Sequence, residues 1–190
     1  MHMILVPSRS EAEFFQITRN PTKMAYYASK VCMFGAALSL LTIATHADPL
    51  RVEAVMTPKE QIRLDFADGS KHFVLMVRRE GKSTGLGLLN GASVTEYGMH
   101  DIVPGVGGDP RGYLVFTAAN GDAAYVKWQV RAIFVPGPDG KLQLNDNGLW
   151  EIAGGTGALS GLVGAGTLHI KTVSPTDRKF LLDGDIYQKN

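Results

Sequence analysis

The amino-acid sequence predicts an all-β domain. From residue 48 onward, apolar and polar residues alternate in short runs, which is the period of half-buried strands. Turn-forming segments such as Ala119-Asn-Gly-Asp122 separate these runs at short spacing. No run in this part of the sequence has the apolar period of an amphipathic helix. About eight strands at such spacing are typical of a β-sandwich or a β-barrel.

The first strands are expected between residues 50 and 79. Their predicted ranges are Leu50–Val55, Ile62–Phe66 and His72–Arg79. Thr57-Pro58 is expected to end the first strand, and Ala67–Ser70 supplies a hairpin turn between the other two. The third strand is apolar on both faces from Phe73 to Val77. It is therefore predicted to be central, or to be covered on its outer face by an extra segment or by a partner subunit in a homo-dimer or trimer.

Later strands follow at similar spacing. They are expected at Ser93–Met99, Tyr113–Ala118, Ala123–Val135, Trp150–Ala153, Thr167–Val173 and Lys179–Ile186. Glu80–Asn90 is interpreted as a glycine-rich connection and Asn145–Gly148 as a turn. The loop from His100 to Gly112 contains two prolines and the aliphatic residues Ile102, Val103 and Val106. Because aliphatic side chains favour burial, this loop is expected to fold onto the mouth of a barrel.

A glycine-rich run, Gly154-Gly-Thr-Gly-Ala-Leu-Ser-Gly-Leu-Val-Gly-Ala-Gly166, lies between two of these strands. Such a density of glycine permits tight bends and close backbone contact, as at the corner of a barrel. The pattern Gly-Gly-Thr-Gly-x-Leu-x-Gly-x-x-Gly-x-Gly resembles the hallmark of the allene oxide cyclase and dirigent barrel superfamily. The resemblance implies a small antiparallel β-barrel of about eight strands over about the last two thirds of the chain. It also implies conformational control of a reaction inside a hydrophobic cavity, without a cofactor.

The same glycines do not form a dinucleotide-binding motif. Gly155-Thr-Gly157 would need to lie between a strand and a helix, with an acidic residue about twenty positions further on. The residues that follow are glycine-rich and then β-branched, with no helical period. The sequence therefore favours the barrel interpretation of these residues.

Residues 1–47 are expected to be a leader that lies outside the fold. Met24–Lys30 is short and positively charged, and Val31–Ala44 is an apolar run of signal-peptide length. Cleavage after Ala47 is expected, with Met24 as an alternative initiator. The prediction is an exported protein, periplasmic or secreted, with one domain over residues 48–190. The apolar run is too short for stable membrane insertion, which takes about twenty residues.

The composition of the expected mature chain excludes several kinds of site. The one cysteine of the full sequence, Cys32, belongs to the leader, so disulfides and thiolate catalysis are excluded for the mature chain. Removing the leader leaves 15 basic and 16 acidic residues, a balance that does not favour nucleic acid as a partner. The histidines His72, His100 and His169 lack the close spacing typical of zinc ligands. We therefore expect neither a metal nor another cofactor.

Proton-transfer groups are densest between Thr95 and Asp101. In a strand, Glu96 and His100 share one face, and Tyr97 and Asp101 share the other. A carboxylate beside a histidine can fix its tautomer and form an acid–base pair. The alternative is a solvated strand face that ends in a histidine and an aspartate.

A second group of candidates surrounds this segment. An arginine in Asp109-Pro-Arg111 could hold a carboxylate at the barrel mouth, or the pair could stabilise its own turn. Trp128 is expected on the inner wall, since Tyr125, Lys127, Gln129 and Arg131 alternate with the apolar residues of its strand. The hypothesis assigns catalysis to Glu96, His100 and Arg111. It assigns ligand binding to Tyr97, Asp101, Asp109, Tyr113 and Trp128.

Two classes of function remain open from the sequence. In the first, the barrel binds an apolar or aromatic small molecule and steers a cofactor-independent isomerisation or cyclisation. In the second, it is a non-catalytic exported module that carries a ligand or belongs to an assembly. An open interior cavity with a polar residue at its base would favour the first class, and an interior filled by side chains would favour the second.

Overall fold

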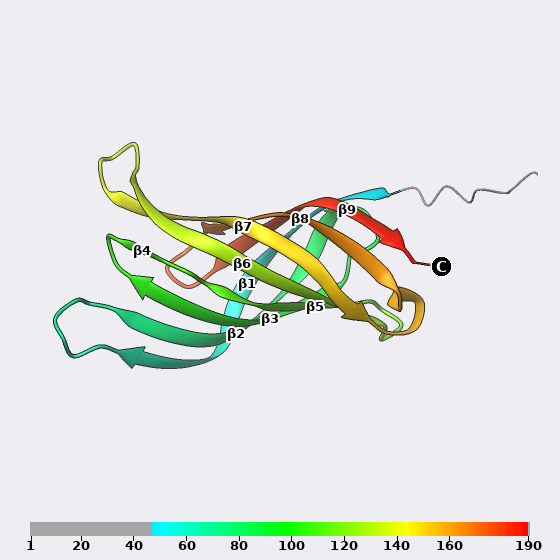
Figure 1. The fold of residues 1–190 in the computed structure, drawn as a ribbon, viewed down its shortest axis with the longest axis horizontal. Helices are drawn as coiled ribbons and strands as arrows, with labels where there is room; N and C mark the ends of the chain where they lie inside the picture. The colour runs from blue at the N-terminus through cyan, green and yellow to red at the C-terminus, as the bar shows by residue number, and fades with distance from the viewer. Residues whose placement is uncertain (1–46, 190) are drawn as a thin grey trace, which may run out of the picture. The chain divides into compact units, whose positions relative to one another are not determined.

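Eight long strands and one short strand form the part of the chain that the computed structural model describes, residues 47–189 (Figure 1). The predicted leader lies outside these residues. The strands are β1 (Asp48–Asp65), β2 (Phe73–Leu86), β3 (Ser93–Val103), β4 (Gly107–Gly108), β5 (Arg111–Thr117), β6 (Ala123–Pro136), β7 (Leu142–Gly155), β8 (Leu162–Thr172) and β9 (Arg178–Gln188). A three-residue 3₁₀ helix, η1 (Gly157–Leu159), connects β7 to β8. Within residues 47–189, no helix has the length and apolar character needed to cross a membrane.

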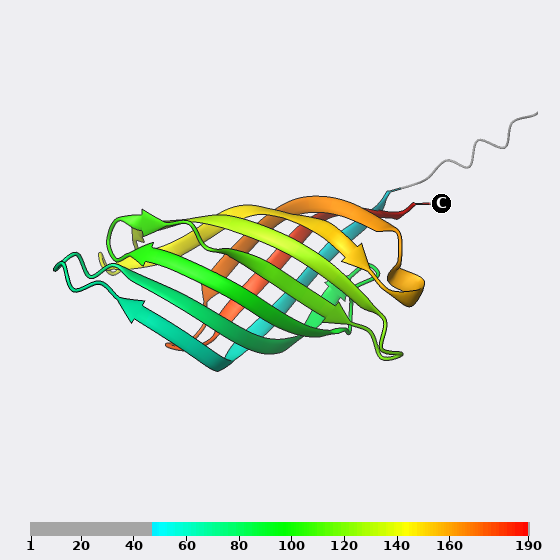
Figure 2. The same cartoon turned by 60° about the horizontal axis from the view of Figure 1, so that its bottom comes forward.

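All strand pairs are antiparallel, and the sheet closes on itself. Each long strand pairs with the next long strand along the chain, and β1 pairs with β9 from Asp48 to Met56. The two-residue strand β4 pairs with both β3 and β6 at one rim. Figure 2 shows β2, β3, β5 and β6 crossing in front of β8, β9 and β1. The prediction of an all-β antiparallel barrel with about eight strands is confirmed.

Several expected boundaries were wrong. Strand β1 does not end at Thr57-Pro58 but continues to Asp65, with a register shift between Pro58 and Glu60. A bulge interrupts the ladder, so the missing N–H of proline is tolerated there. Strand β2 extends to Leu86 through the expected connection, and Asn145–Gly148 lies inside β7 and not in a turn. Pairing with β2 satisfies the backbone of β1 beyond Met56, and pairing with β6 and β8 satisfies that of β7. Local turn propensity does not anticipate such pairing.

The expected loop from His100 to Gly112 is largely strand. Residues up to Val103 belong to β3, and pairing resumes at Gly107. Ile102 is buried, as expected of an aliphatic side chain that packs against the barrel. Val106 does not fold onto the mouth, because it lies at the tip of the connection and is 71% exposed.

The barrel interior is filled by the inward-facing residues of every long strand. Its largest fully buried aromatic side chains are Trp128, Trp150, Phe116 and Phe180. Trp128 contacts Phe180 of β9 edge to face, with ring centroids 5.9 Å apart. Such edge contacts are a favoured geometry for aromatic pairs and help to fix the positions of both rings. The face of β6 that carries Trp128 therefore points inward, as the alternation predicted.

One row of cross-strand partners explains much of the glycine content. It runs through six strands as Gly98, Gly112, Trp128, Trp150, Gly166 and Gly184. A Cβ at Gly112 would lie 3.1 Å from Cζ2 of Trp128, and one at Gly184 would lie 2.8 Å from Cζ2 of Trp150. The glycines thus make room for the two indole rings, and we call this set the glycine–tryptophan row. The glycine-rich run serves this row and also the turn around η1, where Gly161 has a φ of 75°.

Substitution in this row should destabilise the barrel. Gly184→Ala should lower the free energy of unfolding by about 1–3 kcal/mol, because the added methyl group meets the Gly166 backbone and the Trp150 ring. Urea denaturation monitored by circular dichroism would measure the change. The matched control is Gly154→Ala in β7, where a Cβ meets nothing within 4 Å. Equal denaturation midpoints for the two variants would contradict this role of the row.

Candidate functional site

The inner wall of β3 carries two ionisable side chains. Glu96 is fully buried and His100 is 8% exposed. They lie on either side of Gly98, which also faces inward, and His100 Nε2 is 3.2 Å from Glu96 Oε1. A Cβ at Gly98 would lie 2.9 Å from His100 Nε2 and would also clash with the Glu96 carboxylate. Glycine at this position therefore permits the contact between the two side chains.

Arg79 of β2 joins this pair from the neighbouring strand. Its NH1 donates to Glu96 Oε2 at 2.7 Å and lies 3.2 Å from His100 Nε2. A guanidinium can only donate, whereas a carboxylate can only accept. His100 Nε2 can thus accept from Arg79 when it carries no proton and donate to Glu96 when it carries one. This geometry can hold a proton at Nε2 in one state and release it in the other, which is what acid–base chemistry requires.

Asp146 of β7 and Arg178 of β9 extend the group of ionisable residues. Burial raises the pKa of Asp146 to about 6, although the nearby positive charges of His100, Arg178 and Arg79 oppose the shift. Burial and the charge of Arg79 lower the pKa of Arg178. The Arg178 guanidinium donates to the backbone oxygens of Ser174 and Asp177 at the turn before β9. We call Arg79, Glu96, His100, Asp146 and Arg178 the interior polar cluster.

Some buried polar atoms of the interior have no hydrogen-bond partner in the described part of the chain. Four buried side-chain atoms make no hydrogen bond to any described residue: Arg79 Nε, Asp146 Oδ1, Trp128 Nε1 and Trp150 Nε1. Buried polar atoms without partners are rare in folded proteins, and each one needs an explanation. The Trp128 ring lies 5.9 Å from the His100 ring, so an apolar wall adjoins the polar cluster. An apolar wall beside unused polar atoms is typical of a site that orients a small molecule.

The structure divides the predicted site residues into two groups. Glu96, His100 and Trp128 lie together inside the barrel. Arg111, Tyr97 and Tyr113 point outward, so the expectation that Arg111 joins Glu96 and His100 at one mouth was wrong. Pairing of β5 with both β3 and β6 places Gly112, not Arg111, on the inner face. The three outer residues line a groove of about 820 Å³ together with Met76 and Met99.

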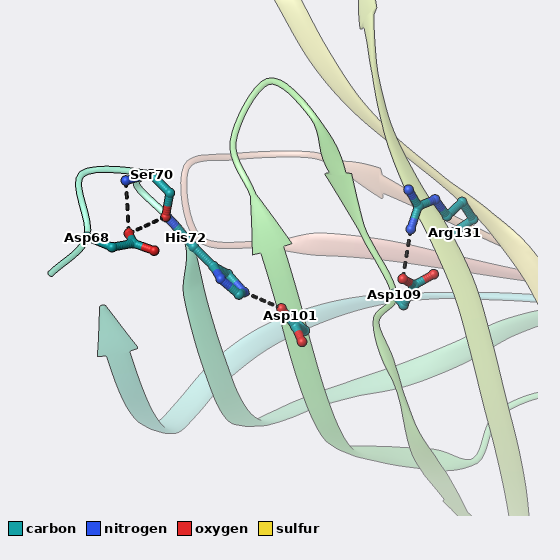
Figure 3. A network of polar contacts seen from close by, with 6 residues as sticks. All are labelled: Asp68, Ser70, His72, Asp101, Asp109 and Arg131. Atoms are coloured by element: carbon teal, nitrogen blue, oxygen red, sulfur yellow. Dashed lines mark hydrogen bonds and ion pairs between the residues drawn. The ribbon is translucent and has the colours of Figure 1, made fainter. Parts of the chain in front are cut away.

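Asp101 and Asp109 also lie outside the barrel, where Asp101 contacts His72 and Asp109 forms an ion pair with Arg131 (Figure 3). Asp101 Oδ1 is 2.5 Å from His72 Nε2, and Asp109 accepts from Arg131 at 2.7 Å. These contacts connect neighbouring strands near the β1–β2 and β3–β4 turns. Ser70 donates its hydroxyl hydrogen to Asp68, which stabilises the turn before β2. The network therefore has a structural explanation, and neither aspartate contacts the interior polar cluster.

Sequence reasoning missed Arg79, Asp146 and Arg178. Arg79 follows Val77 by two positions, and residues two apart in a strand point to the same face. If Val77 had been known to point inward, Arg79 would have been placed inside as well. Because residues 73–77 are apolar on both faces, the sequence did not reveal that phase. Asp146 was hidden in a segment interpreted as a turn. Arg178 immediately precedes the strand that was predicted to begin at Lys179.

A metal centre is not apparent in residues 47–189. No group of three or more histidine, cysteine, aspartate or glutamate side chains in this range could hold a metal ion.

Comparisons with known proteins concern the barrel shape. No protein-family model and no curated protein matches the chain. Similar solved structures include a protein of unknown function from Clostridium acetobutylicum ATCC 824, with 8% identity, a TM-score of 0.46, and coverage of 74% of this chain and 97% of that one. A pterocarpan synthase dirigent protein has 12% identity and a TM-score of 0.46, with coverage of 80% and 96%. A conserved protein of unknown function from Rhodopseudomonas palustris has 11% identity and a TM-score of 0.43, with coverage of 76% and 99%.

The buried carboxyl group of Asp146 should make stability depend on pH. Its pKa is about 6 in the folded chain against 3.8 for the unperturbed group, so the folded state binds more protons between these values. The free energy of unfolding should therefore fall as the pH rises from about 4 to about 6, by about 3 kcal/mol in total. Asp146→Asn should remove this decrease and leave the protein more stable than wild type at pH 8.

Urea denaturation at a series of pH values would measure this effect. The control is Asp185→Asn on β9, since Asp185 is exposed and should leave the pH dependence unchanged. The idea is wrong if Asp146→Asn and Asp185→Asn have the same pH profile.

Proposed function

We propose that this protein binds an apolar or aromatic small molecule inside its barrel and controls a cofactor-independent isomerisation or cyclisation there. Glu96 and His100 would exchange a proton with the bound molecule, and Arg79 would hold the Glu96 carboxylate in place. Trp128 would form the apolar wall that orients the molecule. The predicted signal segment supports an exported location, and an intact mass beginning at Asp48 would test it.

The observation that carries this proposal is the unused hydrogen-bonding capacity of the interior polar cluster. Removing an ionised group from water costs several kcal/mol even after the protein relaxes. A barrel that needed only stability would be expected to fill its interior with apolar residues, as this one does around Phe116 and Phe180. Ionisable groups that are buried and incompletely paired are found preferentially at functional sites.

The central part of the interior limits the size of the bound molecule. Trp128, Trp150, Phe116 and Phe180 fill this region, which by the criterion drawn from the sequence favours the non-catalytic class. A ligand would therefore have to bind beside these rings, at the polar groups. His100, Asp146 and Arg178 come from the parts of their strands nearest the β3–β4, β6–β7 and β8–β9 turns. A small molecule entering between these turns would meet the polar groups before the aromatic rings.

A retained-ligand experiment tests this proposal. The protein would be incubated with a periplasmic extract, and the retained small molecule would be identified and quantified by mass spectrometry. His100→Ala and Glu96→Gln should reduce the bound amount about tenfold or more, since losing one buried hydrogen-bonding partner costs about 1–3 kcal/mol. Conversion of the molecule to an isomer would distinguish an enzyme from a carrier.

Two outer-face variants locate the site. Lys127 lies outside the barrel, paired with Glu151, so Lys127→Ala should retain the molecule. Arg111→Ala reports on the outer groove. If Arg111→Ala releases the molecule and His100→Ala does not, the site is the outer groove and the interior proposal is wrong.

The second candidate function is a role in an assembly, and exposed apolar side chains favour it. On the outer face of β1, β2, β3 and β5, the exposed residues are Ile62, Leu64, Met76, Tyr97 and Tyr113. Ile62 and Met76 are cross-strand partners, so the exposed surface is continuous there. Contiguous apolar surface on a soluble protein commonly marks an interaction site. A homo-dimer or trimer that buries this face is therefore also proposed.

Light scattering at micromolar concentration would test the oligomer. Met76→Lys should shift the protein towards monomer, because a charge in an apolar interface is costly. Thr167→Lys on β8 is the control and should leave the mass unchanged. A monomeric wild-type protein would remove this candidate.

A further inference from the structure

We propose that the interior polar cluster binds the carboxylate group of its ligand and that Asp146 takes up a proton when the carboxylate binds. This inference rests on the proposed binding of a small molecule inside the barrel, and it names the chemical class of that molecule.

The net charge of the cluster depends on the protonation state of Asp146. Arg79 and Arg178 carry two positive charges, and Glu96 and Asp146 carry two negative charges when both carboxyl groups are ionised. These groups come from β2, β3, β7 and β9, and His100 of β3 and Asp177 before β9 are the other titratable groups nearby. When Asp146 is protonated and His100 is neutral, the five residues of the cluster carry one net positive charge, and the half-exposed Asp177 is the neighbouring carboxylate outside the cluster. A ligand carboxylate would neutralise this net charge.

The unpaired atoms favour a ligand that accepts hydrogen bonds. Three of the four are N–H donors, on Arg79, Trp128 and Trp150, and only Asp146 Oδ1 is an acceptor. Arg79 uses NH1 for Glu96 and His100, while its buried Nε has no partner. A carboxylate offers two acceptor oxygens, and a guanidinium fork is well suited to bind one.

Asp146 is the group that must change its charge. Its carboxyl forms no ion pair with a described arginine, although Arg79 and Arg178 both influence it electrostatically. As a carboxylate it would repel the incoming anion in a region of low dielectric. As a neutral acid it would donate its O–H to the ligand instead. The ligand and the proton should therefore bind together.

This coupling predicts a defined pH dependence. Since Asp146 titrates at about pH 6 in the folded protein, the affinity for a carboxylate should fall about tenfold per pH unit above pH 7, as expected for uptake of one proton. The affinity for a neutral ligand of the same shape should not change. Asp146→Asn should remove the pH dependence, because asparagine is neutral throughout.

A matched pair of probes tests the proposal with the full protein. The probes are cyclohexanecarboxylate and cyclohexylmethanol, titrated between pH 6 and pH 8.5. The chain contains two tryptophans, Trp128 and Trp150, and both are buried in the barrel. Their intrinsic fluorescence therefore reports binding close to either indole ring, and neither probe absorbs at the excitation wavelength. Trp128 also lines the outer groove, so the variants of interior residues identify where the probe binds.

Variants identify the groups responsible. Arg79→Met and Arg178→Met should each weaken carboxylate binding at pH 6 about tenfold or more while changing the affinity for the alcohol much less. Arg51→Met is the matched control, since Arg51 lies exposed on β1 in an ion pair with Asp183. Circular dichroism would establish that each variant is folded. If Arg79→Met does not fold, Arg178→Met and Asp146→Asn still test the proposal.

The outcomes separate this proposal from the proposed function. Carboxylate affinity that falls with pH in wild type but not in Asp146→Asn supports it. A pH-independent affinity, or the same pH dependence in Asp146→Asn, overturns it. Binding of the alcohol without the carboxylate also overturns it, yet leaves small-molecule binding inside the barrel intact. Failure of both probes at millimolar concentration counts against both proposals.

Discussion

Filling the centre of a narrow closed barrel is the constraint on which the rest of this structure depends. Closure pairs every long strand with a neighbour on each side and leaves few free edges, but it also fixes how much side-chain volume the interior can hold. Trp128 and Trp150 are adjacent partners on β6 and β7, and each ring requires space on neighbouring strands. Glycines on those strands provide it, most clearly at Gly112 and Gly184. The glycine content is thus a packing requirement as well as a means of turning the chain.

Gly98 connects this packing constraint to the candidate site. It belongs to the glycine–tryptophan row through its pairing with Gly112, and it separates Glu96 from His100 on the same strand face. Because no side chain projects at this position, the carboxylate and the imidazole can approach each other over it. A glycine of the glycine–tryptophan row therefore also brings the acid–base pair together. A change there would alter packing and chemistry at once.

Alternation predicted which faces point inward where one face of a strand is clearly polar. It separated Glu96 and His100 from Tyr97 and Asp101, and it placed Trp128 inside. It failed for Arg79, since β2 is apolar on both faces near its start and the sequence does not show which face points inward.

Alternation failed for Asp146 because Asn-Asp-Asn-Gly has strong turn propensity, which pairing with β6 and β8 overrides. Arg111 was misplaced because prolines and glycines suggested a long mouth loop, whereas pairing with β3 and β6 continues through that region. The missing information in each case was which strands lie beside the residue.

The electrostatics of the interior polar cluster explain how a small barrel can contain so many ionisable groups. A single uncompensated charge in a dry interior is far more costly than a balanced set, and Arg79 and Glu96 balance each other directly at 2.7 Å. Asp146 and Arg178 are near enough to influence each other's charge without forming an ion pair, so their balance is adjustable. One part of the cluster is therefore a fixed ion pair, and the other part can change protonation as its surroundings change. A site built in this way can accommodate a charge from outside without rearranging the strands, because the adjustment is made by a proton and not by the backbone.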